Sequence, residues 1–315
     1  MKPLVIYHGG GCTDGFGAAF AAWLKLGDEA EYLPMEYNQA LPEQLHSPVG
    51  LELYILDFSF RRDQMDTFFQ YAERVVWLDH HASVFKDWGV PLDDVADELT
   101  LGLVQPNDHT VVLDNNKSGA YLAWEYFHPG TEVPMLIRHI DDRDRWQFKL
   151  NGSKELHAAF ASYKPWTFDK WKVWLDDWDL MHRDDMMLEG LAILSAHNQH
   201  VQSALKQARP CEIFKWAPFA NAPGRVIDGF IRYSLFGLAC NAPSFLASDL
   251  GHELANKSGT FGLVWSMAAD GQVHCSLRSN GEYDVSAIAK AFGGGGHRNA
   301  AGFSTDINTL LSWLK

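Results

Sequence analysis

A carboxylate followed by two imidazoles stands directly after one apolar run of the sequence. Asp79, His80 and His81 come after residues 74–78, whose apolar and β-branched side chains are typical of a buried strand. Where a strand ends, these three side chains form a natural site for a metal ion or a phosphate group. The chain has 14 histidines, so the tripeptide taken alone could also be a polar turn with satisfied hydrogen bonds.

Other potential metal ligands follow further predicted elements. His8 and Asp14 flank a glycine-rich turn after the first apolar run, and Asp57 comes directly after the second. Asp142 lies in an acidic cluster, 141–144, after a predicted helix. Imidazoles and carboxylates in this number suit two divalent cations that share a bridging carboxylate. The sequence therefore predicts a centre with two metal ions.

The spacing of apolar residues indicates how these ligands are positioned. Residues 2–7, 51–56 and 74–78 have the pattern of buried strands, while 61–71 and the segment from Asp14 onward are helical. Alternating strands and helices form a parallel sheet with covering helices, and such sheets bind ligands at the carboxyl ends of their strands. We therefore expect the candidate ligands to meet at one edge of a sheet. Further helices are expected at 119–127 and 133–140.

The C-terminal part predicts a second domain. Residues 186–208 lack proline and have few turn residues, which favours a long connecting helix. Short β-like runs follow at 262–268 and 273–277, and a helix at 285–292 precedes four glycines. The predicted class is α/β, with an N-terminal parallel-sheet domain joined by a long helix to a smaller α/β domain. The expected limits are 1–183 for the catalytic domain, 184–210 for the connecting helix and 211–315 for the substrate-binding domain.

The composition of the chain limits the kinds of molecule that it is expected to bind. The formal net charge is −14, whereas proteins that track long nucleic acids usually carry basic stripes, so long duplex nucleic acid is not expected. An acidic protein can still bind phosphate esters through bound cations. No signal peptide or membrane-spanning apolar run is evident, and the four cysteines form no C-x-x-C pair. We expect a cytoplasmic protein with no membrane partner, as a monomer or a homodimer.

The order of the motifs resembles that of the DHH/DHHA1 phosphoesterases. Residues 8–15 (HGGGCTDG) resemble the first motif of the DHH superfamily, Asp57 the second, Asp79-His80-His81 the third, and Asp142 or Asp144 the fourth. Towards the C-terminus, residues 276–279, 284–286 and 292–303 resemble the DHHA1 substrate domain with its GGGH loop. Only about 150–210 is left without a motif.

The resemblance implies a role for each residue of the first domain. One metal ion would be held by His8, Cys12 and Asp57, and the other by Asp14, Asp57, His80 and Asp142, with Asp57 bridging. Asp142 is preferred to Asp144 because the Asp-Arg-Asp-x-Trp pattern begins there. Asp79 would orient His80. His81 would contact a phosphoryl oxygen or protonate the leaving oxygen.

Cys12 departs from the family pattern, which has an aspartate at this position. A thiolate is a softer ligand than a carboxylate and shifts preference from Mn²⁺ or Mg²⁺ toward Fe²⁺, Co²⁺ or Zn²⁺. The expected cofactor is a pair of divalent cations, with Mn²⁺ as the first choice and Mg²⁺, Co²⁺, Fe²⁺ and Zn²⁺ as alternatives. Cys12 could also merely pack in the turn.

The second domain would bind substrate. Its glycines can bring backbone N–H groups close to a phosphate group, and its basic side chains add charged contacts. The tryptophan-rich residues 166–178 could stack on bases, or belong to the core or to an interdomain contact. The residues expected to contact substrate are His81, Arg278, Ser279, Gly294, Gly295, Gly296, His297 and Arg298.

The predicted activity is hydrolysis of phosphodiester bonds in short oligoribonucleotides or dinucleotides to mononucleotides, as in an oligoribonuclease or a short-substrate exonuclease. Three alternatives stay open. The enzyme could remove phosphate from 3′-phosphoadenosine 5′-phosphate, or it could be a pyrophosphatase or exopolyphosphatase. Because Cys12 breaks the expected ligand set, the protein could also be a nucleotide-binding module without catalysis.

Overall fold

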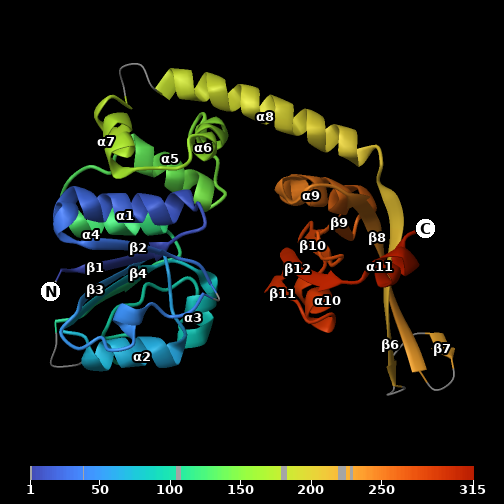
Figure 1. Cartoon of the computed structure of the whole chain (residues 1–315), viewed down its shortest axis with the longest axis horizontal. Coiled ribbons are helices and arrows are strands. Elements are labelled where there is room, and N and C mark those ends of the chain that lie inside the picture. The colour runs from blue at the N-terminus through green and yellow to red at the C-terminus, as the bar shows by residue number, and fades with distance from the viewer. Residues whose placement is uncertain (1, 38, 104–107, 179–182, 219–224, 228–229) are drawn as a thin grey trace. The chain divides into compact units, whose positions relative to one another are not determined.

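The chain divides into two compact units, Met1–Leu194 and Ser195–Lys315. Figure 1 shows the computed structural model, in which each unit has its own sheet. The boundary between the units falls within the long helix α8 (Arg183–Leu205). The domain limits expected from the sequence remain a prediction. The structure describes all residues except 1, 38, 104–107, 179–182, 219–224 and 228–229.

The first unit contains a parallel sheet, as the sequence predicts. Each of its neighbouring strand pairs is parallel, and the strand order places the first strand beside the second and the third. The central strands are buried on both faces, which explains their nearly continuous apolar sequence. Across the sheet, the order is β2 (Glu31–Met35), β1 (Leu4–His8), β3 (Glu52–Leu56), β4 (Arg74–Asp79) and β5 (Thr110–Leu113).

Helices cover both faces of this sheet (Figure 1). Alternate residues of each strand point to opposite cores, so that Val5 belongs to one apolar cluster and Ile6 to the other. One face packs against α1 (Thr13–Leu26), α4 (Gly119–Phe127) and α5 (Met135–Asp144). The other packs against α2 (Arg62–Tyr71) and α3 (Ala82–Trp88).

The segment without a motif completes the core under α1. It forms α6 (Ser153–Ser162) and α7 (Phe168–Asp176). The side chain of Trp171 is fully buried, and its ring centroid lies 4.8 Å from that of Phe16. Of the roles considered for the tryptophan-rich segment, Trp171 and Trp178 have that of core residues. No helix in the described part of the chain is long and apolar enough to cross a membrane.

The second unit is also α/β, but its sheet is mixed. The parallel pair β8–β9 is joined through α9 (Ala247–Ser258), and the other paired strands are antiparallel. In order, the strands are β11 (Gly295–His297), β12 (Ala300–Thr305), β10 (Val273–Ser279), β9 (Phe261–Met267), β8 (Phe230–Asn241) and β6 (Arg209–Pro218), with β7 (Arg225–Ile227) paired to β8. The remaining helices are α10 (Val285–Ala291) and α11 (Ile307–Trp313), and short 3-10 turns lie at Gly27–Glu29, Glu43–Leu45 and Ser244–Leu246.

Candidate metal centre

The carboxyl ends of three adjacent parallel strands bring the first ligands together. His8 is the last residue of β1, Asp57 follows β3, and Asp79 is the last residue of β4. The backbone of Asp57 has φ +52°, a left-handed conformation that is unfavourable for a residue with a side chain. Its N–H donates to the carbonyl oxygen of Leu78 at 2.9 Å, which holds this conformation against β4.

Asp57 presents one carboxylate oxygen to each of two groups of ligands. Its Oδ2 lies 3.5 Å from His8 Nδ1 and 3.8 Å from Cys12 Sγ. Its Oδ1 lies 3.1 Å from His80 Nε2 and 3.8 Å from His81 Nδ1. Asp57 is therefore the residue that connects the two groups. Ligand atoms that lie within 4.8 Å of one another occur in the sets His8, Cys12 and Asp57; Asp57, His80 and His81; and Asp14, His80 and Asp144.

Two buried polar atoms of this cluster make no hydrogen bond among the described residues, although each lies within ion-pair distance of a neighbouring side chain. His8 Nδ1 and Asp57 Oδ1 are buried, and neither has a hydrogen-bond partner among the described residues. An unsatisfied buried polar group costs roughly 1–3 kcal/mol. Both atoms are good ligands for divalent cations, which would satisfy them. The residues present therefore fit a metal centre.

Asp14 is anchored on the other side of the cluster. Its carboxylate accepts hydrogen bonds from the backbone N–H groups of Gly119 at 2.7 Å and Ala120 at 2.9 Å, at the start of α4. Burial disfavours the charge on Asp14, but His80 and these hydrogen bonds outweigh it and lower the pKa of Asp14 to about 2. A Cβ atom at Gly119 would lie 2.3 Å from Cβ of Asp57, so only glycine fits here.

The concentrated negative charge changes the proton affinity of the neighbouring groups. Burial and the charge of Asp14 raise the pKa of Asp57, and the same causes raise the pKa of Asp144 to about 7. Burial opposes a charge on His80, yet Asp14 and Asp57 raise its pKa to about 12. Without a cation, the cluster therefore holds protons to offset its carboxylates. Bound cations would offset the same negative charge.

Of the two fourth-motif candidates, the structure places Asp144, and not the preferred Asp142, beside the other candidate ligands. Asp142 points away from the cluster, where its oxygens accept from the N–H groups of Lys149 at 2.7 Å and Leu150 at 3.0 Å and from Ser153 Oγ at 2.6 Å. In contrast, Asp144 Oδ2 lies 3.5 Å from His80 Nε2. Asp142 and Asp144 are two residues apart on a helix, so their side chains point about 200° apart around its axis. Only one of them can therefore face the metal centre.

Asp79 also differs from its predicted role. Its Oδ1 lies 2.7 Å from His81 Nδ1 and accepts from the backbone N–H of His80 at 2.6 Å, while its Oδ2 accepts from the Ser59 hydroxyl. Asp79 therefore orients the ring of His81 and only the backbone of His80. Burial opposes a charge on His81, but Asp79 raises its pKa to about 9.

Cys12 has two structural roles that the sequence analysis did not consider. It is the N-cap of α1, where Sγ accepts from the Gly15 N–H at 3.5 Å, and its thiol donates to Asp57 Oδ2. Burial and the charges of Asp57 and Asp14 raise the pKa of the Cys12 thiol. A cation must therefore displace this proton before the sulfur can serve as a ligand.

Aromatic side chains beside the metal centre were also not predicted from the sequence. The Tyr37 ring centroid lies 5.4 Å from that of His8, and Tyr37 stacks on Phe58 at 4.8 Å. These two side chains line a cavity of about 380 Å³ together with Phe60 and Arg61. No repeat or motif marks Tyr37 in the sequence, because only the folded chain brings residues 37 and 58 together.

In the second unit, the glycine run does not form the expected open phosphate nest. The N–H groups of Gly293 and Gly294 donate to carbonyl oxygens of α10, and β11 pairs with β12. Glycine at positions 294 and 296 permits close packing, since a Cβ at Gly294 would lie 2.1 Å from the Gly302 oxygen and one at Gly296 would lie 2.5 Å from Ala301 Cα. The N–H groups of Gly293 and Gly294 are therefore already hydrogen-bonded within the protein. The predicted contact of Gly294, Gly295 and Gly296 with phosphate would have to use other groups.

The charged side chains near this run are more accessible. His297 and Arg298 are exposed, and the Arg298 guanidinium lies 3.4 Å from the Gly281 oxygen. Arg278 is half-buried and donates to Ser248 Oγ at 3.1 Å. Ser279 is buried, and its hydroxyl accepts from backbone N–H groups of the following turn. His297 and Arg298 are thus the predicted substrate contacts best placed to meet a ligand.

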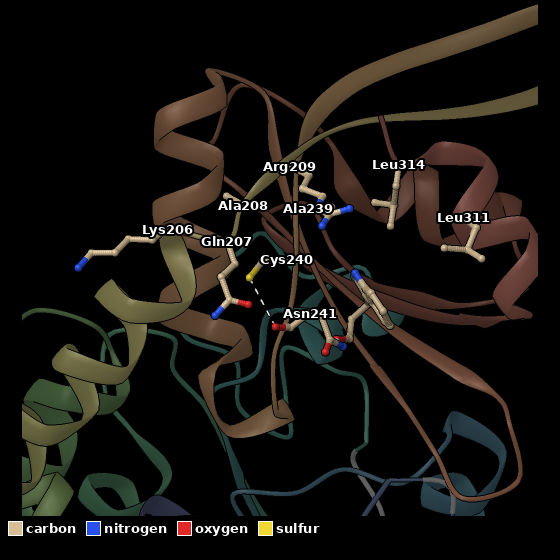
Figure 2. A pocket seen from close by; sticks show the side chains of 10 residues that line it. Lys206, Gln207, Ala208, Arg209, Ala239, Cys240, Asn241, Leu311 and Leu314 are labelled. Atoms are coloured by element: carbon tan, nitrogen blue, oxygen red, sulfur yellow. Dashed lines mark hydrogen bonds between the residues drawn. The ribbon is translucent and has the colours of Figure 1, made fainter.

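A separate cavity of about 510 Å³ lies elsewhere in the second unit (Figure 2). Inside it, the Asn241 amide donates to the Trp265 carbonyl oxygen at 2.9 Å, and the Cys240 thiol lies 3.5 Å from the Asn241 oxygen. None of the predicted substrate residues is part of its lining. The lining residues are Lys206, Gln207, Ala208, Arg209, Ala239, Cys240, Asn241, Trp265, Leu311 and Leu314.

Comparison with known proteins agrees with this architecture. The DHHA1 domain family matches residues 244–312. The chain is 30% identical over 318 residues to the uncharacterized protein R106 of Acanthamoeba polyphaga mimivirus, which covers 96% of this chain and 67% of that protein. In fold, it is similar to the pGpG-specific phosphodiesterase PggH from Vibrio cholerae, with a TM-score of 0.51 at 12% identity over 98% of this chain and 94% of that one.

The fold is similar to that of a phosphodiesterase, and the C-terminal part of the chain matches the DHHA1 domain family. The chain's clusters of carboxylates and imidazoles could hold metal ions. The chain belongs to the DHH/DHHA1 family.

Proposed function

We propose that the protein hydrolyses phosphodiester bonds of short oligoribonucleotides or dinucleotides, releasing mononucleotides, with two divalent cations in its first unit. The observation that carries this proposal is the position of Asp57, whose two carboxylate oxygens face two different groups of ligands. A shared carboxylate of this kind is the usual element of a two-metal site. The negative charge of the chain fits small substrates better than long nucleic acid.

The proposed ligands divide into two sets that share Asp57. When bound, two cations supply an activated water and neutralise the charge on the reacting phosphoryl group. His81 is held by Asp79 at 2.7 Å, so its ring is fixed for donating a hydrogen bond to a phosphoryl or leaving oxygen. The first set is His8, Cys12 and Asp57. The second is Asp14, Asp57, His80 and Asp144, whose carboxylate oxygens lie 3.1–3.5 Å from His80 Nε2.

We propose Mn²⁺ as the physiological metal, with softer cations such as Fe²⁺, Co²⁺ or Zn²⁺ tolerated. Carboxylates favour Mn²⁺ and Mg²⁺, two imidazoles are borderline ligands, and the sulfur of Cys12 favours softer ions. Cys12 Sγ belongs to the same group as His8 and Asp57. We therefore expect a substitution of Cys12 to change the metal preference of this site more than any other of its properties.

For the substrate, we propose short, diffusible nucleotides in the cytoplasm. The exposed His297 and Arg298 of the second unit would contact substrate phosphate, since both carry hydrogen-bond donors and Arg298 a fixed positive charge. The similar fold from Vibrio cholerae belongs to a phosphodiesterase specific for the dinucleotide pGpG, which supports a dinucleotide substrate.

Product analysis on a defined substrate panel tests this proposal. With added Mn²⁺, we expect release of mononucleotides from linear dinucleotides and from RNAs of two to five residues. Phosphate release from 3′-phosphoadenosine 5′-phosphate alone would favour the phosphomonoesterase alternative, and release from pyrophosphate or polyphosphate would favour the pyrophosphatase or exopolyphosphatase alternative. Tight nucleotide binding without turnover, under a broad panel of metals, would refute catalysis.

A further inference from the structure

The segment without a motif supplies two basic side chains to the glycine-rich turn of the metal centre. His157 Nδ1, on α6, lies 3.4 Å from the Thr13 hydroxyl oxygen. Lys164 Nζ lies against Gly11, because a Cβ atom added at Gly11 would come within 2.1 Å of it. Gly11 has φ +78° and only glycine leaves this space open. Both basic groups therefore converge on the turn that carries Cys12.

Arg143 adds a third basic group from α5, next to Asp144. The guanidinium is half-buried and lies 5.1 Å from the centre of the Trp146 ring. Burial together with the positive charges of Arg143 and Lys164 lowers the pKa of His157 to about 4. Burial is the first of these causes, and the charges of Arg143 and Lys164 act in the same direction, so both lie near enough to disfavour the protonated form of His157. The cationic cluster, defined here as Arg143, His157 and Lys164, thus contains two cations and a neutral imidazole.

The two cations of this cluster have no anionic partner in the part of the chain that the structure describes. Among the described residues, neither Arg143 nor Lys164 makes an ion pair, and Lys164 lies 4.8 Å from the Trp166 ring centre. Their neighbours behave differently, since Arg145 pairs with Asp141 at 3.4 Å and Lys172 pairs with Asp176 at 2.6 Å. In a chain of net charge −14, two cations that both act on one imidazole and have no counter-ion are suited to bind an external anion.

We propose that Arg143, His157 and Lys164, with the Thr13 hydroxyl, bind a terminal phosphomonoester of the substrate, beside the metal centre where the phosphodiester is cleaved. This inference rests on the proposed function for the identity of its ligand. Arg143 offers a planar pair of donors, Lys164 a point charge, and Thr13 and His157 one neutral hydrogen-bonding group each. A dianionic terminal phosphate uses all of these donors, whereas a terminal hydroxyl leaves the two cations unpaired.

Binding to matched dinucleotides tests the subsite without turnover. Titration calorimetry of the full chain in Ca²⁺ would compare GpG with its 5′-phosphorylated form pGpG and its 3′-phosphorylated form, with ligand integrity checked by chromatography afterwards. We expect one phosphorylated form to bind about tenfold to a hundredfold tighter than GpG, since hydrogen bonds to charged groups contribute on that scale. The form preferred identifies the end of the substrate that is bound.

Substitutions assign the preference to the cluster. Lys164→Met and Arg143→Met should each reduce the phosphorylated-to-hydroxyl ratio to a few-fold and leave GpG affinity unchanged. Lys172→Met and Arg145→Met are matched controls from the same helical region and should keep the ratio. Lys164→Arg should also keep it, which guards against loss by misfolding. Equal affinity of wild type for all three ligands, or an unchanged ratio in Lys164→Met, would overturn the subsite.

The same experiment separates the two proposals. If phosphorylated ligands bind preferentially but no dinucleotide is hydrolysed under any metal, the subsite stands and the proposed hydrolysis fails. If dinucleotides are hydrolysed but the three ligands bind equally, the hydrolysis stands and the subsite fails. Absence of binding to every dinucleotide would overturn the subsite.

Discussion

The metal centre of the first unit and the glycine run of the second are organised in opposite ways. In the first unit, Asp14, Asp57 and Asp79 are almost fully buried, and two polar atoms of the centre make no hydrogen bond among the described residues. In the second unit, the backbone of the glycine run is hydrogen-bonded internally, and His297 and Arg298 are exposed. The chemistry is therefore built into the first unit, while the second offers surface charge.

This difference indicates where geometry is held rigidly. Asp57 keeps an unfavourable backbone conformation, and Gly119 leaves the space that its carboxylate occupies. Strain of this kind persists only where the surroundings hold it in place. The glycines at 294 and 296 instead allow two strands to pack closely. Substitutions in the first unit should therefore affect metal binding and turnover, and those in the second should affect substrate affinity.

Asp57→Asn is the change with the largest expected effect. A neutral amide cannot bridge two cations, so turnover should fall by roughly a thousandfold or more, on the scale of losing a major electrostatic contact in the transition state. The fold should be retained, because asparagine has the same size and removes a buried charge. Steady-state kinetics with a circular dichroism control would check this. A loss of less than tenfold would remove Asp57 from the centre.

Asp144→Asn and Asp142→Asn should separate metal binding from stability. Asp144 faces His80, so its substitution should lower metal affinity and activity by about tenfold to a hundredfold with little change in stability. Asp142 accepts three hydrogen bonds away from the centre, so its substitution should cost about 1–3 kcal/mol in the free energy of unfolding and leave metal affinity unchanged. Denaturant unfolding and metal titration on both variants distinguish these results; the reverse pattern would restore Asp142 as ligand.

Cys12→Asp tests the departure from the family pattern. A carboxylate can cap α1 as Cys12 does, and it replaces a soft ligand with a hard one. Activity should be retained, and the ratio of rates in Mn²⁺ and Zn²⁺ should move toward Mn²⁺ by about tenfold. Cys12→Ser serves as the control. If Cys12 only packs in the turn, the serine variant keeps full metal content and the aspartate variant keeps its metal preference.

His297→Ala should have the smallest effect of this series. An exposed hydrogen-bond donor to phosphate contributes about 1–1.5 kcal/mol, so kcat/KM should fall by about fivefold to tenfold while metal content stays unchanged. His274→Ala is the matched control, because His274 is also exposed in the second unit and bonds to Ser304 at 3.1 Å. Metal loss in His297→Ala equal to that in Asp57→Asn would contradict the division of roles between the units.

Local sequence patterns were sufficient to predict the strands and helices that carry the candidate ligands. The predicted helix 119–127 coincides with α4, and the three predicted strands overlap β1, β3 and β4. Their apolar runs are nearly continuous because the strands are buried on both faces. The edge strand β2 (Glu31–Met35) was missed, since its partly exposed residues and Pro34 weaken the pattern.

The direction in which the candidate side chains point could not be predicted from the sequence. Asp142 and Asp144 are equally plausible from their residue type, and only the orientation of α5 decides which one faces His80. The partner of Asp79 likewise depends on the turn after β4, where His81 folds back onto it. The cationic cluster joins residues 143, 157 and 164 to the turn at 11–13, and no local motif records such a long-range contact.

Counting bound cations tests the central claim most directly. The metal-stripped full chain would be titrated with Mn²⁺ by calorimetry, alongside Asp57→Asn, and the bound metal per chain would be measured after gel filtration. If Asp57 joins two ligand groups, wild type should bind two cations per chain and Asp57→Asn one or none. A single cation in wild type, or two bound with unchanged affinity in Asp57→Asn, would contradict a shared two-metal centre.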